Sequence, residues 1–193
     1  MKKIAVFCGS SMGASEAYAS GARELGKELA RRGLSLVYGG ANVGLMGAVA
    51  NSVLSEGGEA IGILPGFLKN REIAHPLLSE LVIVDSMHER KAKMAELADG
   101  FIVLPGGAGT MDEFFEIFTW LQLGLHAKPC GLLNVNRYFD PLIALIAHMA
   151  DENFLQEKYR TAVLVDEDPG ELLNRFATYG APDVKTYDLA RRA

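Results

Sequence analysis

The stretch that most constrains the fold is an apolar run that leads directly into a glycine loop and then into a helix. Residues 100–104, GFIVL, are typical of a strand covered on both faces. Residues 105–113 read PGGAGTMDE, and apolar side chains then recur at helical spacing over 114–121. A loop almost without side chains exposes its backbone, and the N–H groups at a helix start favour a phosphate or another anion.

A capping box is a second interpretation of the same stretch. Glu113 follows Thr110 by three residues, the spacing at which a threonine caps a helix and a glutamate bonds back to the cap. We expect Thr110 to cap the helix under either interpretation. Glu113 then either completes the box or turns toward a ligand on the loop.

Strand-like and helix-like segments alternate along the whole chain, joined by short turns that contain glycine or proline. We expect strands over residues 3–8, 34–38, 59–64, 81–85, 101–104, 129–133 and 162–165, and helices over 15–32, 44–55, 87–98, 138–150 and 169–178, besides the central helix. This order predicts the α/β class, as a Rossmann-like, doubly wound parallel sheet with helices on both faces. We expect a single domain over 1–180 and a C-terminal tail over 181–193.

Composition excludes several classes of function. A net charge of -5 without a basic cluster argues against nucleic-acid binding, and no apolar run is long enough to cross a membrane. Cys8 and Cys130 lie in strand-like sequence without a metal-type partner, so we expect reduced core thiols in a cytoplasmic protein. The four histidines lack metal-ligand spacing, and we expect neither a metal nor a cofactor.

Two glycine loops follow strands, at 38–44 and 104–109, and the carboxyl ends of parallel strands are where such sheets bind ligands. The loop after the first strand is not GxGxxG, and the chain lacks the lysine of a P-loop. A monophosphate is therefore a better candidate than a dinucleotide or a triphosphate.

The helix expected over 87–98 breaks the usual separation of polar and apolar faces. Arg90 and Lys91 share a helical stripe with Met87 and Met94. Two cations on an inward-facing stripe indicate a functional site, since such violations tend to occur there. The alternative is that both side chains extend around the sheet edge to reach water.

The central helix has a second apolar arc at Phe115, Trp120 and Leu123. Such a helix is either wholly buried or shared with a partner subunit. A homodimer built around it and a core-only role are about equally compatible with the pattern.

Four short motifs occur together along nearly the whole length: CGSS at 8–11, GG at 39–40 with GLMG at 44–47, MHERK at 87–91 and PGGAGTMDE at 105–113. With these motifs the chain resembles the LOG family, the cytokinin-activating phosphoribohydrolases long mislabelled as lysine decarboxylases. One departure is Ala41-Asn42, where relatives commonly continue with a third glycine.

The resemblance implies hydrolysis of the N-glycosidic bond of an adenosine 5′-monophosphate, preferably N6-substituted, to free base and ribose 5-phosphate. Arg90 and Glu113 fall on the catalytic pair of the family. The substrate- and phosphate-binding positions implied are Ser10, Gly40, Glu72, Arg90, Lys91, Gly106, Gly107, Gly109, Thr110, Glu113 and Thr119.

The residues themselves agree with this chemistry. Cleavage through an oxocarbenium-like state needs a nearby carboxylate and a phosphate anchor. Glu113 would stabilise the cationic sugar or activate water, while Arg90 orients Glu113 or the phosphate. A non-catalytic carrier of a nucleotide-like ligand and a general AMP nucleosidase remain alternatives, and the sequence leaves the base undetermined.

Overall fold

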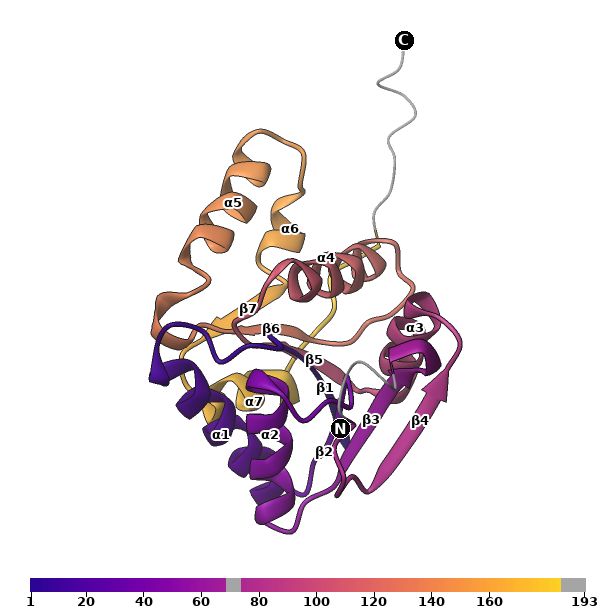
Figure 1. Ribbon diagram of the computed structural model, residues 1–193. Coiled ribbons are helices and arrows are strands. Elements are labelled where there is room, and N and C mark those ends of the chain that lie inside the picture. The colour runs from indigo at the N-terminus through magenta and orange to yellow at the C-terminus, as the bar shows by residue number, and fades with distance from the viewer. Residues whose placement is uncertain (69–73, 185–193) are drawn as a thin grey trace.

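A seven-stranded, all-parallel sheet forms the centre of the molecule in a computed structural model, which describes residues 1–68 and 74–184 (Figure 1). The strands are β1 (Lys3–Phe7), β2 (Ser35–Tyr38), β3 (Ala60–Pro65), β4 (Glu80–Val84), β5 (Gly100–Val103), β6 (Cys130–Leu133) and β7 (Val163–Asp166). Their order across the sheet is β4-β3-β2-β1-β5-β6-β7. The predicted strands are confirmed, with ends that differ by a residue or two.

Helices cover both faces of this sheet, as the alternation predicts (Figure 1). They are α1 (Glu16–Arg31), α2 (Gly44–Ser55), α3 (Met87–Leu97), α4 (Ala108–Gln122), α5 (Asp140–Asp151), α6 (Glu157–Arg160) and α7 (Pro169–Ala177). One core forms between the sheet and α1, α2 and α7, and a second between the sheet and α3 to α6. Three short elements were not predicted, α6 and the 3₁₀ turns η1 (Gly66–Leu68) and η2 (Val135–Arg137), because three or four residues carry no measurable periodicity.

The direction of strand progression reverses between β1 and β5, which places a ligand crevice at their carboxyl ends. β1 runs into the loop of Gly9, and β5 into the loop of Pro105. The two loops are tied together, because the Gly9 N–H donates to the Pro105 carbonyl at 3.0 Å. The Leu45 N–H, at the end of the predicted loop 38–44, donates to the Gly9 carbonyl at 3.0 Å, so both predicted glycine loops, 38–44 and 104–109, lie beside the Gly9 loop.

The start of α4 differs from the prediction. The helix begins at Ala108 with Gly107 as its N-cap, and no side chain caps it. Thr110 lies inside the first turn and is buried, so the prediction that Thr110 caps the helix is wrong. The glycines explain the difference, since an N-cap glycine costs little and lets the helix start earlier.

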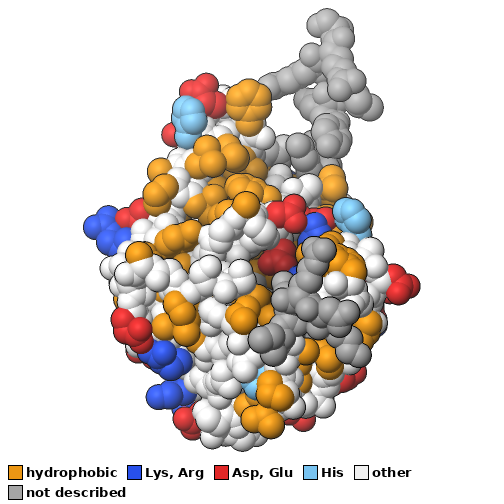
Figure 2. Space-filling view, in the orientation of Figure 1, with side chains coloured by type: hydrophobic (Ala, Val, Ile, Leu, Met, Phe, Trp, Pro, Cys, Tyr) orange, Lys and Arg blue, Asp and Glu red, His pale blue; other side chains and the backbone are white. Residues whose placement is uncertain are grey.

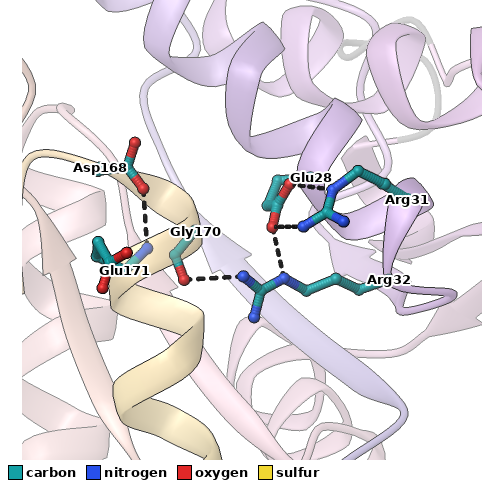
Figure 3. A network of polar contacts seen from close by, with 6 residues as sticks. All are labelled: Glu28, Arg31, Arg32, Asp168, Gly170 and Glu171. Atoms are coloured by element: carbon teal, nitrogen blue, oxygen red, sulfur yellow. Dashed lines mark hydrogen bonds and ion pairs between the residues drawn. The ribbon is translucent and has the colours of Figure 1, made fainter.

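A small network of hydrogen bonds and ion pairs joins α1 to α7, which cover the same face of the sheet (Figure 3). Arg32 follows α1 and donates to the Gly170 carbonyl of α7 at 2.9 Å and to Glu28 at 2.5 Å. A hydrogen bond from Arg31, together with Arg32, lowers the pKa of Glu28 to about 2. These contacts tie the end of α1 to the start of α7 on this face of the sheet.

Both cysteines are free and buried, as predicted. Within the described ranges, no helix has the length and apolar character needed to span a membrane. The boundary between domain and tail at residue 180 stays a prediction. Residues before 185 do contact the core, because the Tyr159 hydroxyl donates to the Asp183 carbonyl at 2.9 Å.

Candidate active site

A cavity of about 320 Å³ opens at the carboxyl ends of β1 and β5. Its walls come from the loop after β1, the loop after β2, the inner side of α3 and the first turns of α4. Three of these walls, all except the loop after β2, contain functional candidates from the sequence: Ser10, Arg90, Gly107, Gly109, Thr110 and Glu113. The fold thus brings together six of the predicted site residues, which span more than a hundred positions of the chain.

The glycine loop shows why side chains are missing there. A Cβ atom on Gly106 would lie 2.1 Å from the Thr110 hydroxyl and 2.8 Å from the Gly9 nitrogen, so only glycine fits. A Cβ on Gly107 or Gly109 would meet nothing within 4 Å. Within the described residues, the backbone N–H groups of 107–110 have no acceptor. This edge of the cavity therefore offers several free donors at the positive end of a helix dipole.

Arg90 is buried, with 6% of its surface exposed, and its Nε atom has no hydrogen-bond partner in the described part of the chain. Gly39 makes room for its guanidinium, because a Cβ at that position would lie 2.0 Å from Nη2. The Arg90 Nη1 atom donates to the Met87 sulfur, a weak acceptor, at 3.8 Å. A buried guanidinium with so little hydrogen bonding is costly unless an anion completes it. The prediction that Arg90 lies on the inward stripe of α3 is confirmed, together with the burial of Met94.

Glu113 faces the same cavity from α4. Burial raises its pKa to about 7, an effect that nearby Arg90 opposes and Asp112 reinforces. Among the described residues, no hydrogen bond or ion pair joins Arg90 to Glu113. Orientation of Glu113 by Arg90 thus has no direct contact here to carry it, and the guanidinium stays available to a ligand.

Lys91 is also buried, but unlike Arg90 it forms ion pairs with α4. Its ammonium lies 3.0 Å from Asp112 and 2.9 Å from Glu116, both on α4. Burial lowers the pKa of Lys91, but the hydrogen bonds to Glu116 and Asp112 outweigh it and the pKa is raised. The charged lysine therefore ties α3 to α4 and holds the two walls of the cavity together.

The remaining predicted residues lie around the cavity or away from it. Gly40 is not among the residues that line the cavity. Its carbonyl accepts from the His75 N–H at 2.9 Å, and its φ is +83°. Thr119 is exposed on α4, more than two turns beyond Thr110. Glu72 lies outside the described residues. Roles for these three in binding stay predictions.

Several lining residues carry no functional prediction from the sequence, and three of them affect the chemistry of the cavity. Met46 contributes an apolar wall from α2, Gly39 accommodates Arg90, and Cys8 follows the last residue of β1. Burial and then Glu113 raise the pKa of the Cys8 thiol, which keeps it protonated and unsuited to attack. The motifs at 8–11, 39–40 and 44–47 contain all three residues, but the sequence assigned a role to none of them.

Comparison with known proteins shows which family the chain belongs to. The chain is 51% identical over 168 residues to the cytokinin riboside 5′-monophosphate phosphoribohydrolase of Rhodococcoides fascians, covering 86% of this chain and 85% of that protein. The chain belongs to the LOG family. Residues 46–176 match the family model described as possible lysine decarboxylase.

A second LOG-family relative is the cytokinin riboside 5′-monophosphate phosphoribohydrolase LOG of Oryza sativa subsp. japonica, 44% identical over 178 residues, or 92% of this chain and 73% of that one. Among solved structures, the molybdenum cofactor binding protein of Rippkaea orientalis superposes with a TM-score of 0.69 at 22% identity. It covers 92% of this chain and 96% of that chain. At this identity the likeness concerns the fold alone.

Proposed function

We propose that this chain hydrolyses the N-glycosidic bond of adenosine 5′-monophosphates, preferably N6-substituted, releasing the free base and ribose 5-phosphate in the cytoplasm. The observation that carries the proposal is that buried Arg90 and half-buried Glu113 line the walls of one cavity, beside a loop with free backbone donors. The two relatives above carry the name of this activity.

The 5′-phosphate binds at the start of α4 in this proposal. The N–H groups of residues 107–110 and the helix dipole supply donors without a mobile cation. Arg90 adds a full positive charge from the opposite wall. Anchoring the phosphate fixes the sugar, so that its C1′ atom is held near Glu113.

Glu113 then acts on the anomeric carbon. In the reaction the C1′–N9 bond breaks, an oxygen from water bonds to C1′, and a proton ends on the base. The ionised carboxylate stabilises positive charge on the sugar and accepts the proton of the attacking water. A pKa near 7 lets Glu113 take up and release that proton close to neutral pH.

The decisive experiment is to incubate the purified chain with AMP and with isopentenyladenosine monophosphate, and to assay free base and ribose 5-phosphate. We expect release of both products in equal amounts, faster with the N6-substituted nucleotide. Binding of both nucleotides without product would refute the hydrolase and favour the carrier. Equal rates on both would make the chain a general AMP nucleosidase.

We also propose a homodimer formed by the outer surface of α4 and α5, which we call the α4–α5 face. Only Ile146 is buried in α5, although the helix reads DPLIALIAHMAD. Leu145 is 45% exposed and Phe154, just beyond the helix, is 86% exposed. Figure 2 shows hydrophobic side chains gathered over α4 and α5. Apolar surface of this extent is typical of a protein interface.

A further inference from the structure

A second chamber, of about 270 Å³, lies beside the glycine loop and shares Gly9, Ser10 and Gly107 with the active-site cavity. Its wall includes Tyr138, which follows β6 and η2. The Tyr138 hydroxyl donates to the Gly106 carbonyl at 2.5 Å. A side chain more than thirty positions further along the chain thus bonds directly to the backbone of the loop.

The bond fixes the direction of one peptide group. Because a trans peptide is planar, its carbonyl and the following N–H point in opposite directions. With the Gly106 carbonyl held by Tyr138, the Gly107 N–H is turned away from Tyr138. A rotated peptide would instead present a carbonyl oxygen to an anion, which it would repel. Glycine on both sides of this peptide makes such rotation easy unless something opposes it.

The turn that carries Tyr138 is built to hold it in place. Asn136 and Arg137 adopt left-handed backbone conformations, with φ of 50° and 58°, which cost energy in residues other than glycine. The buried side chain of Asn134 accepts from the Phe139 N–H at 2.7 Å and donates to Asp140 at 2.9 Å. Strain of this kind persists where the surroundings fix the backbone. The strained residues precede Tyr138, and the Asn134 hydrogen bond holds Phe139 after it.

The ring of Tyr138 is also held. Tyr18 of α1 packs edge-on against it, with ring centroids 5.7 Å apart and planes at 80°. Phe139 packs on it at 5.1 Å and is itself buried. The hydroxyl is therefore aimed at the loop before any ligand arrives, which is the condition for a preorganised site.

We propose that Tyr138 is a positioning residue for the phosphate-binding loop, which it keeps in the orientation that receives the 5′-phosphate. The inference rests on the proposed function. Tyr138 does not contact the reacting atoms in this scheme. It acts on phosphate binding in the ground state and the transition state alike, so its loss raises KM and leaves kcat nearly unchanged.

The test compares Tyr138→Phe with Tyr159→Phe in the full chain. Tyr159 provides a matched control, because its hydroxyl also donates to a backbone carbonyl, that of Asp183 at 2.9 Å, but away from the cavity. We expect Tyr138→Phe to raise KM for AMP and the dissociation constant of inorganic phosphate about 3- to 10-fold, the usual effect of one hydrogen bond. Adenosine, which has no phosphate, should bind the variant as it binds the wild type.

An unchanged KM in Tyr138→Phe, or a fall in kcat at constant KM, would overturn the proposal. So would an equal increase in KM in Tyr159→Phe, or equal weakening of adenosine and phosphate. Direct titration with AMP and phosphate separates this inference from the proposed function. If the wild type releases no base, the hydrolase fails, whereas the loss of phosphate affinity in Tyr138→Phe still decides the role of Tyr138.

Discussion

Replacement of Glu113 by glutamine should abolish turnover and at the same time stabilise the protein at alkaline pH. Burial raises the pKa of Glu113 from 4.5 to about 7. One pKa unit corresponds to about 1.4 kcal/mol, so ionised Glu113 lowers the free energy of unfolding by up to about 3 kcal/mol. The amide has nearly the same shape as the protonated acid but cannot ionise.

The sign of this effect follows from where the proton is held. Below the unfolded pKa of 4.5 both states are protonated, and Glu113 adds no penalty. As the pH rises toward 7, the unfolded chain releases the proton more readily than the folded one, and stability falls. The advantage of Glu113→Gln should therefore grow from near zero at about pH 4.5 to about 3 kcal/mol at about pH 8.

Urea unfolding of both proteins at several pH values measures this difference directly. The control is Glu96→Gln on α3, whose side chain is 67% exposed and should show no comparable pH dependence. Turnover of Glu113→Gln should be lost at every pH. A difference in unfolding free energy that stays constant across the range, or a variant with normal turnover, would refute the reasoning for Glu113.

Three further predictions follow from the cavity and the α4–α5 face. Lys91→Met leaves two carboxylates of α4 without their cation, and urea unfolding should show a loss of about 1–2 kcal/mol. Gly39→Ala should displace the guanidinium of Arg90 and lower kcat/KM about 10- to 100-fold, measured by release of base. Leu145→Asp should convert a dimer to a monomer in light scattering. The control is Leu77→Asp, which should not change the oligomeric state, because the Leu77 side chain is 71% exposed but lies just before the edge strand β4, outside the α4–α5 face.

Contrary results for these variants are equally specific. Full stability of Lys91→Met would remove Lys91 from the link between α3 and α4. Normal activity of Gly39→Ala would show that the position of the Arg90 guanidinium does not limit catalysis. A wild-type chain that is monomeric at all concentrations would refute the dimer through the α4–α5 face.

Local pattern was enough to predict most of the fold, since strand-length apolar runs and helical stripes are properties of short segments. It also predicted that Arg90 faces inward, because two cations on a buried stripe are visible in the sequence. The same pattern predicted one inward-facing role for both Arg90 and Lys91. Their separation into a cavity residue and a tie to α4 depends on Asp112 and Glu116, which only the packed helices bring within reach.

The glycine loop shows the division between sequence and structure most clearly. The sequence by itself determined that residues 105–109 form a loop with an open backbone at the end of a buried strand, because glycine and proline restrict local conformation. Only the tertiary structure decided that α4 starts at Ala108, that Gly106 is wedged against Gly9, and that Tyr138 bonds to the loop. These contacts join segments distant along the chain, and their free energy arises only when the sheet brings the segments together.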